Sequence, residues 1–156
     1  MQHQQAQVSW RDGEVPVLSG GALLVRKSAF DQVSGFDPKI FLFHEDDDLS
    51  LRLKNQCGPL RYVFGAQVRH LLGHSTERSA RTAALKAWYM GQSRVYAARK
   101  HGQSFGFLRA LAEAALQLAS PLNLLSARKR NKSWYYFRAI LSSPGGQAAD
   151  RPPPWS

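Results

Sequence analysis

The sequence predicts an α/β segment followed by a helical C-terminal region. Between residues 15 and 71, short apolar runs flank a helical pattern, as expected of strands and helices that pack in layers. From residue 79 onward, apolar residues recur at helical spacing instead. The charge changes at nearly the same place, because residues 1–77 are close to neutral whereas residues 78–138 hold 12 Lys and Arg and one acid, Glu113.

The composition is that of an ordinary folded protein. The 156 residues are 44% hydrophobic and 21% charged, and no apolar run is long enough for a transmembrane helix. The single cysteine, Cys57, excludes an internal disulfide. We expect a disordered N-terminus over 1–14, the α/β segment over 15–77, a basic helical extension over 78–142 and a disordered tail over 143–156.

The first elements are a strand and a short helix. Val15 to Val25 is almost continuously apolar, which predicts a strand buried on both faces. Ser19-Gly20-Gly21 interrupts this strand, as a bulge or the close approach of another group would. Ser28 is expected to cap a short helix that ends at Gly35.

A second helix is predicted from His44 to Lys54, with acids in its first turn, where the helix dipole favours them. Asp48 is expected to pair with Arg52 four residues later. Gly58-Pro59 ends this helix. Two short strands are then predicted at Leu60–Val63 and Gln67–Leu71.

Three helices are predicted in the basic region. They span Ser79–His101, Phe105–Ala119 and Lys129–Leu141, and Gly102 and Pro121 end the first two.

Four consecutive acids, residues 45–48, are the densest chemical signal. Like charges this close need a counter-charge, a metal or solvent. A carboxylate at a helix start beside a cleft can act as a general base, and the alternative is a solvated, dipole-stabilised helix terminus. His70 and His74 are too few ligands for a metal site. Phosphate-loop, dinucleotide and Gly-x-Ser-x-Gly motifs are absent from the sequence.

The order of these motifs over residues 15–78 resembles the C-terminal half of the catalytic domain of family 2 glycosyltransferases, especially the rhamnosyltransferase-like ones. The resemblance is carried by Ser19-Gly20-Gly21 through Phe30, Gly35-Phe36-Asp37, Phe41, Glu45-Asp46, Asp48-Leu49, Arg52, Gly58, Tyr62-Val63, Ala66, Val68 to His70 and Ser75.

The resemblance implies a partial glycosyltransferase A fold, the C-terminal half of a nucleotide-sugar sandwich. It also implies a divalent metal (Mg or Mn) held by an aspartate-any-aspartate motif, and inversion at the sugar carbon through a carboxylate base. Asp46 matches that base, which deprotonates the acceptor hydroxyl, and Glu45 matches its partner. Gly20 and Gly21 match small residues that line the acceptor side.

Other positions match less directly. Asp48 and Arg52 match the rest of the acidic motif; we group them with the substrate-binding positions and interpret them as support for the helix start. His70 matches a histidine that helps bind the metal or diphosphate in some members. Ser34 stands where a glycine is usual, and Phe64 where a proline is usual.

The nucleotide-binding units and metal-binding aspartates of the family should precede residue 15, where the chain has only 14 residues. We therefore expect a fragment or half of an inverting glycosyltransferase of bacterial surface polysaccharide synthesis, inactive and without bound metal when alone. Its expected partners are a nucleotide-sugar donor, a saccharide or lipid-linked acceptor and an N-terminal half. The expected location is cytoplasmic, including the inner face of the cytoplasmic membrane.

The alternative interpretation is a non-catalytic adapter that binds a membrane or a partner protein through its basic helices. Phe105 to Leu125, followed by Arg128-Lys129-Arg130, suits an anionic bilayer. A nucleic-acid partner is not expected, because no binding-module signature appears.

Overall fold

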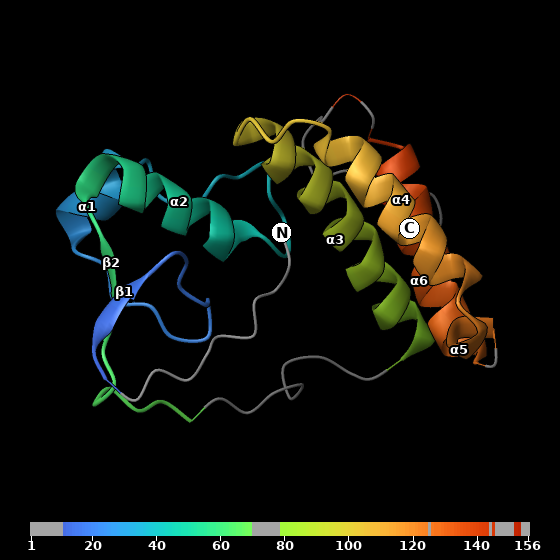
Figure 1. The fold of residues 1–156 in the computed structure, drawn as a ribbon, viewed down its shortest axis with the longest axis horizontal. Helices are drawn as coiled ribbons and strands as arrows, with labels where there is room; N and C mark the ends of the chain where they lie inside the picture. The colour runs from blue at the N-terminus through green and yellow to red at the C-terminus, as the bar shows by residue number, and fades with distance from the viewer. Residues whose placement is uncertain (1–10, 70–78, 125, 144, 146–151, 154–156) are drawn as a thin grey trace. The chain divides into compact units, whose positions relative to one another are not determined.

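The computed structural model describes residues 11–69, 79–124, 126–143, 145 and 152–153 (Figure 1). The chain divides into two compact units. The first unit comprises Met1–Phe36 and Asp46–Leu71, and the second comprises Asp37–Glu45 and Leu72–Ser156. Residues 37–45 thus group with the helical region, which the sequence did not indicate. The disorder expected for residues 1–10 and for most of 143–156 lies outside the described residues.

The first unit contains a two-stranded antiparallel sheet. Strand β1, Gly13–Val15, pairs with strand β2, Leu60–Tyr62, in a register that sets Val15 opposite Leu60. The strand predicted at residues 60–63 is therefore confirmed. Strand β1 begins at Gly13, so its first two residues lie inside the segment 1–14 that was expected to be disordered.

The long strand predicted from Val15 to Val25 is wrong beyond Val15. The chain turns at Ser19, whose carbonyl accepts a hydrogen bond from the Ala22 N–H. Just before this turn, the Leu18 N–H donates to the Ser50 hydroxyl at 3.0 Å, and the same hydroxyl donates to the Leu18 carbonyl. A side chain thus satisfies both backbone groups that a neighbouring strand would have bonded.

The strand predicted at Gln67–Leu71 is also not formed in its described part. Residues 67–69 have no strand partner among the described residues, and Gln67 bonds locally to the Gly65 carbonyl. Residues 70 and 71 lie outside the described residues.

Helix α1, Lys27–Gln32, is where the sequence predicts it, but its N-cap is Arg26 and not Ser28. The Arg26 side chain makes no capping bond, so this helix start lacks the usual stabilisation. Past the C-terminus, Ser34 and Gly35 are both left-handed, with φ of 61° and 65°, and the Gly35 N–H bonds the Phe30 carbonyl. The left-handed backbone at Ser34 explains why glycine suits that position.

Helix α2, Glu45–Cys57, confirms the predicted second helix, and Gly58, with φ of 113°, ends it. Its residues Leu49 and Leu53 pack with Val33 and Leu60 to form the core of the first unit.

The second unit is built from helices α3, Ala80–Lys100, α4, Gly106–Ala119, α5, Pro121–Leu124, and α6, Ala127–Leu141. The three predicted helices are confirmed within two residues at each end. The Ser79 hydroxyl caps α3 through the Thr82 N–H. Pro121 ends α4 as predicted, and it also opens α5, since proline suits a first helical turn.

Helices α3, α4 and α6 pack side by side (Figure 1). Small residues let them approach closely: a Cβ added at Gly91 would lie 2.8 Å from both the Ala139 Cβ and the Tyr136 carbonyl oxygen. The core of the unit contains Ala87, Val95, Ala110, Ala114, Tyr136 and Ile140.

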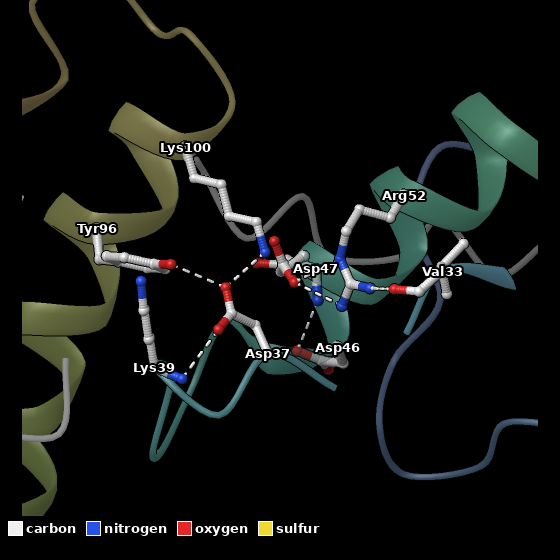
Figure 2. A network of polar contacts seen from close by, with 9 residues as sticks. Val33, Asp37, Lys39, Asp46, Asp47, Arg52, Tyr96 and Lys100 are labelled. Atoms are coloured by element: carbon white, nitrogen blue, oxygen red, sulfur yellow. Dashed lines mark hydrogen bonds and ion pairs between the residues drawn. The ribbon is translucent and has the colours of Figure 1, made fainter. Parts of the chain in front are cut away.

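Polar contacts join residues 37–45 to helix α3 (Figure 2). The Asp37 carboxylate accepts from the Tyr96 hydroxyl at 2.9 Å, from Lys100 Nζ at 2.6 Å and from the Lys39 N–H at 2.9 Å. Burial acts to raise the pKa of Asp37, but these three donors outweigh it and lower the pKa below its ordinary value. The buried Ser93 hydroxyl donates to the Leu42 carbonyl at 2.8 Å.

Candidate functional site

Asp46, in the first turn of α2, is the residue that the sequence singled out as a base. Its Oδ2 accepts the Gly20 N–H at 2.7 Å, and its Oδ1 accepts the Asp47 N–H at 3.0 Å. Asp46 is half-buried, so the residue keeps some contact with solvent. The structure therefore brings together two residues that lie 26 positions apart and that the sequence assigned to one site.

Gly20 approaches Asp46 so closely that a side chain would crowd it. A Cβ built at Gly20 would lie 3.2 Å from Asp46 Oδ2 and 3.5 Å from its Cγ. The glycines that interrupt the apolar run thus allow the close approach of another group. Of the two predicted alternatives, a bulge or a close approach, the second is the one observed. The neighbouring Gly21 is exposed, and its N–H donates to the Ser19 hydroxyl.

Ser50 is a site residue that sequence reasoning missed. It lies one helical turn after Asp46, and its hydroxyl bonds Leu18, two residues before Gly20. Two side chains of one helix face therefore hold alternate residues of the same loop. The spacing of four residues places Asp46 and Ser50 on one face of the helix. The sequence does not indicate which loop packs against that face.

The expected pair between Asp48 and Arg52 is confirmed. Asp48 Oδ2 accepts a hydrogen bond from Arg52 Nε at 2.9 Å and forms an ion pair with Nη2 at 2.8 Å, and the Asp48 side chain is fully buried. Arg52 Nη1 donates to the Val33 carbonyl (Figure 2). The pair therefore ties α2 to the end of α1 and neutralises one of the four acids. The assignment of Asp48 and Arg52 to substrate binding stays a prediction.

The remaining predicted residues lie as follows. Glu45 begins α2, is half-buried, and has its Oε2 shielded from solvent. His70 lies outside the described residues. Just before Glu45, Phe43 and His44 both have left-handed backbones, with φ of 66° and 65°. Consecutive left-handed residues other than glycine are costly, and such strain clusters near functional sites.

The described residues do not fit a metal centre. Within residues 11–69, 79–124 and 126–143, no three His, Cys, Asp or Glu side chains gather into a group that could hold an ion. In the acidic run, Asp48 is bound by Arg52, and both oxygens of Asp46 accept backbone N–H groups.

No helix in the described part of the chain is both long and apolar enough to cross a membrane.

Comparison with known proteins finds no matching family model and no matching solved structure. Two strains of Mycobacterium tuberculosis, CDC 1551 / Oshkosh and ATCC 25618 / H37Rv, have a relative named N-acetylglucosaminyl-diphospho-decaprenol L-rhamnosyltransferase. It is 38% identical over 116 residues, which is 74% of this chain and 37% of the relative. Rhamnosyltransferase WbbL of Escherichia coli K12 is 36% identical over 91 residues, 58% of this chain and 34% of that protein.

These relatives confirm the resemblance that the motif order suggested. The chain spans little more than a third of their length.

Proposed function

We propose that this chain, a sequence relative of rhamnosyltransferases of the family 2 glycosyltransferase type, supplies the acceptor-activating part of an inverting glycosyltransferase. The complete enzyme would transfer a sugar, of the rhamnose class by kinship, from a nucleotide-sugar donor to a saccharide or lipid-linked acceptor in bacterial surface polysaccharide synthesis. The kinship supports the reaction class, and the contact between Asp46 and Gly20 supports the role of this chain.

The proposed chemistry centres on the Asp46 carboxylate. Asp46 takes the proton of the acceptor hydroxyl as that oxygen attacks the anomeric carbon of the donor sugar. The new C–O bond forms on the face opposite the bond to the diphosphate. That bond breaks, the nucleoside diphosphate leaves with its electron pair, and the configuration inverts. Each carboxylate oxygen has two lone pairs, so Asp46 can accept from an acceptor hydroxyl while it keeps its bond to Gly20.

Gly20 and Ser50 serve as positioning residues in this proposal. The Gly20 N–H fixes one carboxylate oxygen of Asp46, and Ser50 fixes the loop that carries Gly20. A base held this way loses little freedom when the acceptor binds, which favours a near-attack geometry. Gly21, exposed beside it, leaves room for a sugar to approach.

The chain would need a donor-binding part from outside its described residues. The kinship supports a fold of the glycosyltransferase A type for the complete enzyme, and the two-stranded sheet of the described residues is too small to bind a nucleotide in the manner of an α/β sandwich. A divalent cation, where the complete enzyme uses one, would be held outside the residues described here, because they do not fit such a centre.

The decisive experiment is a transfer assay in the longer polypeptide or complex that contains this chain, with a nucleotide-linked rhamnose, a divalent cation and a lipid-linked saccharide acceptor. Asp46→Asn keeps the shape and removes the proton acceptor, so kcat should fall about 10²–10⁴-fold while the donor KM stays similar. Asp31→Asn, at an exposed acid of α1, is the matched control.

Full activity of Asp46→Asn would show that another group is the base. Activity of the 156-residue chain alone would leave the base in place and remove the need for a separate donor-binding part. No transfer from any form of the protein would favour the adapter interpretation.

A further inference from the structure

Helix α4 exposes an apolar stripe as well as burying one. Its inner face, with Ala110 and Ala114 fully buried, belongs to the core of the second unit. On the outer face, Leu108 and Leu116 are 56% and 73% exposed, and Phe105, just before the helix, is 73% exposed. Positions 105, 108, 112, 116 and 119 recur at helical spacing, and Ala112 and Ala119 complete this exposed stripe.

Phe105 combines a left-handed backbone with a side chain that is largely exposed to water, and both are unfavourable for phenylalanine. Gly106 packs so tightly that an added Cβ would lie 2.6 Å from the Ala98 Cβ, so the start of α4 is pressed against α3. The chain enters α4 through Phe105 in a left-handed backbone with φ of 60°, and this directs a large aromatic side chain into solvent. Insertion of the ring into an apolar phase would offset that cost.

Exposed cations lie at one end of this stripe. Residues 127–132, the first turns of α6, are all exposed, and they include Arg128, Lys129 and Lys132. The four-residue helix α5 joins the end of α4 to the start of α6 and packs on both, so these cations lie near the end of α4 that carries Leu116. From residue 105 to 143 the only acid is Glu113, and it is paired with Arg94.

We propose that the second unit binds the surface of an anionic membrane through the outer face of α4 and the first turns of α6. An apolar stripe flanked by lysine and arginine inserts at the boundary between lipid headgroups and acyl chains, while its cations contact anionic headgroups. A nucleic acid would use the cations but gain little from Leu108 and Leu116. The proposal is independent of the catalytic role of Asp46.

Flotation of the 156-residue chain with lipid vesicles tests the proposal. Vesicles of phosphatidylcholine mixed with phosphatidylglycerol should carry the protein upward at low salt, and vesicles of phosphatidylcholine alone should carry much less. Binding should weaken as salt rises, because the ionic contribution is screened.

Two variants separate the apolar and ionic contributions. Leu108→Ser with Leu116→Ser should reduce partitioning by about tenfold or more, since two exposed leucines no longer insert. Arg128→Glu with Lys129→Glu should reduce it by about 25-fold or more, because each cation contributes about fivefold. The second pair also places acids in the first turn of α6, where the helix dipole favours them, so the fold is preserved.

The matched control is Arg26→Glu with Arg69→Glu. It makes the same change of charge at exposed sites of the first unit and should leave flotation nearly unchanged. Failure to float with anionic vesicles at low salt would overturn the proposal, as would equal losses in the control and the α6 variant. Concentration-dependent dimerisation abolished by Leu108→Ser with Leu116→Ser, without flotation, would instead assign the stripe to a second copy of the chain.

Discussion

The two units of the chain are held together in different ways. In the second unit, three long helices bury a core of small, aliphatic and aromatic side chains, and the helices approach one another closely at Gly91 and Gly106. In the first unit, two three-residue strands and two helices share a small core, and side chains bonded to distant backbone groups supply the remaining connections.

This difference shows where each unit is vulnerable. Helix packing spreads its stabilisation over many contacts, so a change of volume is the way to damage the second unit. The first unit relies on a few polar contacts at fixed positions, and the loss of one leaves a buried group without its partner. It also exposes several apolar residues, including Leu24 at 99%, Val63 and Val68.

The largest effect should come from breaking the buried pair of the first unit. Asp48→Ala leaves the Arg52 guanidinium buried without its carboxylate, and we expect a loss of about 3–5 kcal/mol in the free energy of unfolding. Hydrogen exchange of the α2 amides would measure it. Asp31→Ala breaks the exposed pair with Lys27 and should cost only about 0.5 kcal/mol. Equal losses would contradict the view that buried polar contacts hold this unit.

A smaller loss is expected from crowding the second unit. Gly91→Ala adds a methyl group against the Tyr136 carbonyl and Ala139, and overpacking of this kind costs about 1–3 kcal/mol. The better helix propensity of alanine returns about 1 kcal/mol, so we expect a net loss of up to about 2 kcal/mol in thermal or denaturant unfolding. Gly65→Ala, where the added methyl meets open space, is the control. A gain of stability in Gly91→Ala would mean that α3 and α6 separate easily.

The smallest change should be a gain in the first unit. Ser34→Gly removes the side chain from a left-handed residue and should raise the free energy of unfolding by about 0.5–1 kcal/mol. Ser28→Gly, within helix α1, should lower it by a similar amount, because glycine is a poor helix former. The two variants make the same chemical change with opposite expected signs. A loss of stability in both would show that the backbone at Ser34 is not under strain.

The helices were predictable because they are encoded locally. The helix-ending residues Gly102 and Pro121 and the spacing of apolar residues gave α3, α4 and α6 within two residues, and the charge pattern gave the pair between Asp48 and Arg52. The N-cap of α1 was predicted wrongly because Arg26 is not a typical capping residue and its side chain makes no capping bond.

The strands and the loop were less predictable because they depend on distant residues. An apolar run such as residues 15–25 forms a strand only beside a partner, and here the Ser50 hydroxyl takes that place at Leu18. The motif order singled out Asp46 and Gly20, but their direct contact and the role of Ser50 depend on how α2 lies against the loop.

The two contacts that α2 makes with the loop around Gly20 form a small motif that could be transplanted to another protein. Asp46 and Ser50 lie one helical turn apart. Their side chains bond the backbone N–H groups of Gly20 and Leu18, so two alternate residues of the loop are fixed. A design that copies only the acid and the glycine onto another scaffold would leave the loop free to rotate about a single bond. Copying the serine as well, on any helix with a three-residue partner segment, would carry the orientation of the carboxylate along with its identity.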